Sequence, residues 1–171
     1  MIRPKVQFVV REREREIRAV QVKTARNKRG KMPALYKLCF DGKLDEVRAE
    51  LARGGDVNDK YSANGWTALM HAVRNGHNPI VKLVLDHPAV QANEKTNSGW
   101  TALHFAAWKN NAEGARMLLL HPGFNSADSS NNSCETALMW AVINYKKKFL
   151  HELVKHERVS LDLREGAFDG R

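Results

Sequence analysis

Hydrophobic residues along this chain gather in short groups with helical spacing, separated by polar segments rich in Asn, Ser and Gly. One group follows Asn78 and Pro79 and ends before Pro88. Its apolar side chains share one helical face: Ile80, Val81, Val84 and Leu85. Asn78 can cap this helix, and a proline in the first turn costs no hydrogen bond. The pattern therefore predicts a short amphipathic helix.

A second short helix is predicted directly upstream. Thr67 can cap a helix that begins at Ala68, and the Asn75-Gly76 pair can end it after about two turns. The polar stretches 60–65 and 95–99 end in Asn-Gly and Ser-Gly, which favour tight, hairpin-like turns. The unit is thus helix, turn, helix, with a projecting turn between units.

This unit is repeated along the chain. The segment GWTALMHAV at 65–73 returns as GWTALHFAA at 99–107 with six of nine residues identical, and CETALMWAV at 134–142 is a third copy. The threonine recurs at intervals of 34 and 35, and a histidine keeps the same two intervals. These landmarks are Thr67, Thr101 and Thr136, and His87, His121 and His156. Two markers with one period indicate a repeated structural unit.

The repeated region extends beyond these three copies. Residues 33–60 contain two helical groups and a Gly-Gly turn but lack the threonine, as expected of a degenerate outer copy. In the last copy Tyr145 replaces the turn glycine. We therefore predict a basic N-terminal segment at 1–32, a repeat domain at 33–165 and a tail at 166–171. The repeats are predicted at 33–60, 61–95, 96–130 and 131–165.

The copies resemble ankyrin repeats, whose motif is a turn glycine, a variable residue and Thr-Pro-Leu-His. His104 in Thr101-Ala102-Leu103-His104 is the best match to the motif histidine, which in this family braces the turn by hydrogen bonding. Methionine takes its place in the neighbouring copies, and alanine stands where the family usually has proline. The resemblance implies an all-α fold, a solenoid of about four helix-turn-helix units with projecting β-turn hairpins.

The resemblance also implies a function and a surface. Ankyrin repeats bind protein partners, so we expect a non-enzymatic scaffold, adaptor or inhibitor that acts through its turn tips and first helices. In the family, the residue before the threonine and the two after the paired small residues face the partner. At matching positions these are Trp66, Arg74, Asn75, Trp100, Trp108, Lys109, Glu135, Ile143 and Asn144.

Two hypotheses explain why a tryptophan recurs beside the turn glycine. Trp66 and Trp100, with Trp108 near them, can form an exposed ridge whose composition is that of an interface hot spot. Alternatively, each indole can fold back against its neighbour's turn and stiffen the stack without touching a partner. The sequence leaves both open.

Charge distinguishes the head of the chain from its body. The formal net charge is +9, and residues 1–32 carry 11 Lys and Arg against 3 Glu, so the remainder is nearly balanced. A purely basic cluster lies within this head: Arg26, Lys28, Arg29 and Lys31. It can contact nucleic acid or serve as a nuclear-import patch, which makes a nuclear or nucleic-acid-associated regulator the alternative function. It can equally be a solvated tail, and the sequence does not decide whether 1–32 is ordered.

Patterns typical of enzymes and cofactor sites do not occur. The chain has no Gly-rich phosphate loop, HExxH pair or CxxC spacing, and its recurring histidine falls at a helix end, where a cation is favourable. Cys39 and Cys134, both predicted in apolar helical contexts, are too few for a disulfide framework or structural zinc site. No run of eighteen apolar residues predicts a membrane span. We expect no cofactor or metal, and a monomer that is intracellular, either cytoplasmic or nuclear.

Overall fold

The computed structural model describes residues 34–61 and 63–155, which contain eight helices arranged in four pairs. The first helices of the pairs are α2 (Leu35–Asp41), α4 (Ala68–Asn75), α6 (Ala102–Lys109) and α8 (Ala137–Ile143). The second helices are α3 (Leu44–Ala52), α5 (Asn78–Leu85), α7 (Ala112–Leu120) and α9 (Lys147–Leu153). A two-stranded antiparallel ribbon of β1 (Lys60–Tyr61) and β2 (Trp66–Thr67) joins the first two pairs. The predicted all-α repeat solenoid is confirmed.

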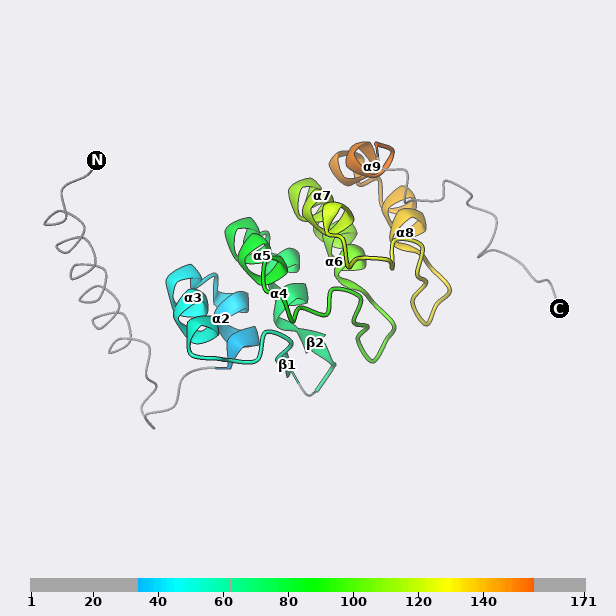
Figure 1. Cartoon of the computed structure of the whole chain (residues 1–171). Coiled ribbons are helices and arrows are strands. Elements are labelled where there is room, and N and C mark those ends of the chain that lie inside the picture. Colours follow the sequence, from blue (N-terminus) through cyan, green and yellow to red (C-terminus); the bar gives the residue numbers. More distant parts are fainter. Residues whose placement is uncertain (1–33, 62, 156–171) are drawn as a thin grey trace, which may run out of the picture.

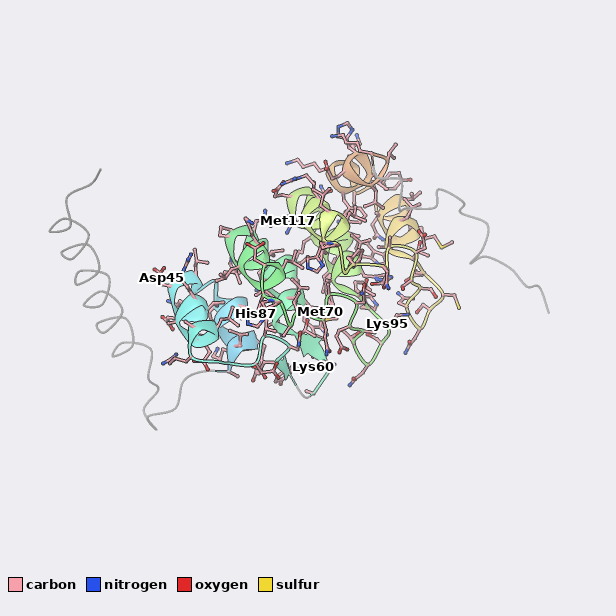
Figure 2. All side chains as sticks on the ribbon, viewed as in Figure 1. Asp45, Lys60, Met70, His87, Lys95 and Met117 are labelled. Carbon is pink, nitrogen blue, oxygen red and sulfur yellow. The ribbon has the colours of Figure 1, made fainter. Side chains whose placement is uncertain are left out.

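The pairs stack in sequence order and form two layers. Each first helix contacts the first helix of the next pair, and each second helix contacts the next second helix. In Figure 1 the connecting segments, including β1 and β2, project from the side of the first helices. We call the surface formed by the first helices and these segments the inner face. Lys60 and Lys95 lie on successive connecting segments (Figure 2), where Lys60 pairs with Glu94 at 2.8 Å.

Threonines start the first helices as the sequence predicts. The Thr67 hydroxyl accepts the Met70 amide at 3.2 Å before α4, and the Thr136 hydroxyl accepts the Met139 amide at 3.1 Å before α8. The prediction for Asn78 is wrong, because this residue is already inside α5 and its N-cap position is held by His77. The Asn78 side-chain oxygen instead accepts a hydrogen bond from Asn111 at 3.0 Å, so it joins two repeats.

A left-handed residue ends each first helix or follows it closely. The φ angles at these equivalent positions are 73° for Gly42, 73° for Gly76, 56° for Asn110 and 54° for Tyr145. Glycine takes this conformation without the steric clash that a Cβ atom causes. At Tyr145 the left-handed conformation is therefore destabilising. Cys134 is also left-handed, with φ of 58°, in the exposed turn before α8, so its predicted helical context is wrong.

The core runs continuously through the stack. Alanines at the helix contacts are almost fully buried, which lets the helices approach closely: Ala68, Ala72, Ala102, Ala106, Ala137 and Ala141. Phe105, Phe124 and Phe149 supply the largest buried side chains of this core. No single pair could bury this surface alone, so stacking is what stabilises each repeat.

Asparagine side chains connect successive repeats outside the core. Asn58 donates to the Ala89 carbonyl and accepts the Gln91 amide, both at 2.8 Å. One repeat later, Asn93 donates to the Gly123 carbonyl at 2.6 Å and accepts the Asn125 amide at 2.8 Å. Each asparagine therefore satisfies the backbone of the following connecting segment, which otherwise has no sheet or helix partner there.

Candidate interaction surface

Four half-buried tryptophans form a row on the inner face, which we call the tryptophan ridge: Trp66, Trp100, Trp108 and Trp140. Trp100 contacts Trp108 at 5.8 Å and Trp140 at 5.9 Å between ring centroids. Trp66 and Trp100 also contact the buried ring of Phe105, at 4.4 and 5.3 Å. The indoles thus pack against one another and against the core, and each keeps part of its surface in solvent.

Cationic side chains lie on this ridge. The Arg74 guanidinium sits between two indoles, 5.2 Å from the Trp66 centroid and 4.9 Å from that of Trp108. Its Nε atom is buried and has no hydrogen-bond partner among the described residues. Lys109 lies 5.8 Å from the Trp108 ring and Lys146 lies 5.7 Å from Trp140. The ridge therefore combines aromatic surface with positive charge.

An aromatic pocket of about 270 Å³ continues the ridge towards the first repeat. It is lined by Tyr36, Lys37, Phe40, Tyr61 and His71, with the two tyrosine rings 5.4 Å apart. We call it the tyrosine pocket. The His71 ring also contacts Trp66 at 5.2 Å, so the pocket and the ridge share one side chain.

His71 is an uncharged wall of this pocket. Its side chain is 7% exposed, and neither ring nitrogen has a hydrogen-bond partner in the described part of the chain. Burial, with a smaller contribution from the positive charge of Arg74, lowers the His71 pKa from 6.5 to about 4. The imidazole is therefore neutral at physiological pH and adds no charge to the pocket.

His104 has the bracing role that the motif implies. Its Nδ1 atom accepts the Thr101 amide at 3.2 Å, and its Nε2 atom lies 3.0 Å from the Glu135 carbonyl of the next repeat. Burial lowers its pKa, although the bond to the Glu135 carbonyl opposes this shift. His104 thus joins the third and fourth helix pairs.

Three of the residues predicted to face a partner have partners within the protein. The Asn75 amide donates to the Phe40 carbonyl at 2.8 Å, and the Asn144 amide donates to the Trp140 carbonyl at 2.8 Å. The Glu135 carboxylate accepts the Asn131 amide at 3.1 Å. Lys109 and Ile143 are exposed, and Ile143 has 64% of its surface in solvent. The direct partner role of these residues stays a prediction.

Sequence reasoning missed Trp140 and Phe105 as parts of this surface. Both stand four positions after the repeat threonine, where the second copy has His71. An aromatic ring at the same position in three copies is the signal that could have identified them. The tyrosine pocket had no such signal, because its residues come from two repeats and a connecting segment.

Other predicted features lie elsewhere or outside the described residues. The basic cluster of Arg26, Lys28, Arg29 and Lys31 precedes residue 34 and is not described by the structure. Within residues 34–61 and 63–155, no group of three or more His, Cys, Asp or Glu side chains could hold a metal ion. No helix in this same part of the chain is long and apolar enough to cross a membrane.

Comparison with known protein families agrees with this architecture. The family model described as ankyrin repeats in three copies matches residues 35–129, which covers the first three helix pairs and more than half of the chain. The fourth pair, α8 and α9, lies beyond the match and packs on α6 and α7 in the same manner. The chain therefore belongs to the ankyrin-repeat family.

Proposed function

We propose that this protein is a non-enzymatic scaffold, adaptor or inhibitor that binds a protein partner through its inner face. Ankyrin repeats are in general protein–protein interaction modules, and the observation that carries the proposal is the tryptophan ridge with cations lying on it. Half-exposed tryptophan and arginine side chains are the residue types most enriched at the energetic centres of interfaces. The predicted monomeric state and intracellular location accompany this proposal.

Rigidity of the ridge favours binding. Trp100 contacts four aromatic rings, and Arg74 is held by two indoles, so these side chains lose little conformational freedom when a partner covers them. Association costs less free energy when interface side chains are already ordered. The same indoles can therefore stiffen the stack with their buried part and contact a partner with their exposed part.

The proposal is tested by charge reversal on the inner face. The double variant Arg74→Glu, Lys109→Glu is compared with the control Lys43→Glu, Arg48→Glu, which changes two exposed cations at α3 in the opposite layer. Each protein is used for affinity capture from cell lysate with quantitative mass spectrometry, after circular dichroism verifies its helical content.

A set of proteins that the parent and the control retain and the inner-face variant loses is the expected result. Equal capture by the inner-face variant would show that the partner binds elsewhere, for example through the head of the chain.

A further inference from the structure

We propose that the inner face binds an extended acidic segment of its partner, with a carboxylate on Arg74 and a neighbouring apolar side chain in the tyrosine pocket. This inference rests on the proposed function and names the chemistry of the partner. Two adjacent features carry it: a guanidinium without a counter-ion and an aromatic pocket whose one cation, Lys37, is paired with Asp41.

Arg74 is a cation whose charge is not compensated within the described residues. Its Nε atom is buried and unpartnered, and no described carboxylate forms an ion pair with it. Asp41 and Glu94 form ion pairs with other cations, Lys37 and Lys60. The Nε atom is covered by the protein, whereas the terminal Nη atoms are not among the buried unpartnered groups. A partner's carboxylate would therefore be bound end-on by the two Nη groups of the planar guanidinium.

The two indoles make this arginine a specific site. The guanidinium lies within cation–π distance of both Trp66 and Trp108, which restricts its movement and reduces its contact with water. Charge-assisted hydrogen bonds are stronger where water is partly excluded. Lys109 and Lys146 lie further along the same ridge and extend the positive surface that an acidic segment would meet.

The tyrosine pocket suits an apolar side chain. Tyr36, Phe40 and Tyr61 line it with ring surface, and His71 contributes a neutral ring. The one charged residue that lines it, Lys37, forms an ion pair with Asp41 at 3.4 Å. The pocket therefore has no uncompensated charge of its own.

The spacing between the two features matches an extended peptide. His71 and Arg74 are three positions apart on α4, so their side chains are neighbours on one helix face. In an extended chain, alternate side chains point the same way and lie about 6.6 Å apart. An apolar residue and an acidic residue at positions i and i+2 could then enter the pocket and contact Arg74 together.

Stacking of nucleic-acid bases is less well supported on this surface. Non-specific binding of single strands needs free aromatic faces beside the cations. Arg74 lies over one side of Trp66 while Phe105 packs 4.4 Å away, and Lys146 lies over Trp140. The indole faces are thus largely occupied by the protein's own side chains.

The test is a selection of random peptides of about twelve residues, displayed on phage, against the full chain. Enriched peptides are then measured by fluorescence anisotropy against the parent, Arg74→Gln, Arg74→Lys and the control Arg116→Gln. Arg116 pairs with Glu113 on α7, in the opposite layer. A labelled oligouridylate is titrated in parallel.

We expect enriched peptides to carry Asp or Glu two positions from an aromatic or aliphatic residue. Their affinity should fall at least about tenfold in Arg74→Gln and in Arg74→Lys, which keeps the charge but loses the planar fork. Arg116→Gln should bind as the parent does.

Enrichment of peptides without an acid, affinity that is unchanged in Arg74→Gln, or no enrichment at all would overturn the inference. Tight binding of oligouridylate that depends on Arg74 would also overturn it, in favour of a nucleic-acid site. The lysate capture separates this inference from the proposed function. If a protein partner is lost by the inner-face double variant while peptide selection shows no acidic preference, the proposed function stands and the acidic segment is wrong.

Discussion

Replacing His71 by leucine should remove a pH-dependent part of the stability of this protein. The imidazole is 7% exposed and lies among Tyr36, Phe40, Trp66 and Arg74 without a hydrogen bond in the described part of the chain. Folding lowers its pKa from 6.5 to about 4, because burial and the nearby guanidinium disfavour the charged ring. The unfolded chain therefore binds this proton more tightly than the folded protein does.

The sign and size of the effect follow from these two values. The contribution of His71 to stability is fully present above pH 6.5 and is lost as the pH falls from 6.5 towards 4. Between about pH 7.5 and about pH 5 the loss amounts to roughly 2 kcal/mol. One edge of the His71 ring lines the tyrosine pocket, so this figure is the largest loss of stability that we expect.

Leucine has a similar volume and no proton to bind. At neutral pH we expect His71→Leu to be as stable as the parent or up to about 1 kcal/mol more stable, because the buried ring nitrogens lack partners. At about pH 5 its advantage should grow by roughly the 2 kcal/mol that protonation costs the parent. His104 and the carboxylates titrate in both proteins, so their effects cancel in the difference.

The assay is urea unfolding followed by tryptophan fluorescence and far-ultraviolet circular dichroism at both pH values. The exposed His151→Gln variant is the control and should track the parent at each pH. A difference in unfolding free energy between His71→Leu and the parent that does not change with pH would refute the view that His71 is held neutral by its surroundings.

Three further predictions concern other parts of the chain. His104→Met, which copies the neighbouring repeats, should lose the contact to the Glu135 carbonyl and cost about 1 kcal/mol, with faster amide exchange in α8 and α9 by mass spectrometry. Unchanged exchange there would contradict a bracing role. Tyr145→Gly should raise the melting temperature, because Tyr145 is 84% exposed and its left-handed backbone costs about 1 kcal/mol that glycine avoids. A lower melting temperature would count against this reasoning. Removal of residues 1–32 should abolish any salt-dependent affinity for DNA or RNA in filter binding, and affinity that survives the deletion would exclude the basic head as its source.

Local features of the fold were predictable because the sequence repeats them. Thr67, Thr101 and Thr136 correctly mark the starts of α4, α6 and α8, since a capping hydroxyl acts within one helical turn. The apolar face of α5 is likewise buried as its spacing predicts. Asn78 shows where this reasoning fails. Its residue type favours a cap, but its side chain is used by Asn111 of the next repeat.

The interaction surface depends on contacts between repeats and was only partly predictable. The motif positions predicted that Trp66, Arg74 and Trp108 face a protein partner. They did not indicate that the guanidinium would lie between the two indoles, because that arrangement depends on how one repeat stacks on the next. Phe105 and Trp140 were not predicted because the residue type at their position changes from repeat to repeat. Only the presence of an aromatic ring four positions after the threonine is shared.

The hydrogen bonds of Asn58 and Asn93 to the following connecting segments also affect how repeats can be added to such a protein. Each of these bridges reaches the next connecting segment, and the two asparagines are 35 residues apart while the backbone groups that they bind recur after 34 residues. A duplication of one whole repeat would therefore carry both halves of a new joint, and no existing joint would need redesign. Insertion of a few residues inside a connecting segment would instead move the acceptor carbonyl away from its donor. The asparagine hydrogen bonds are therefore kept when a whole repeat is added, and they are broken when a few residues are inserted within a connecting segment.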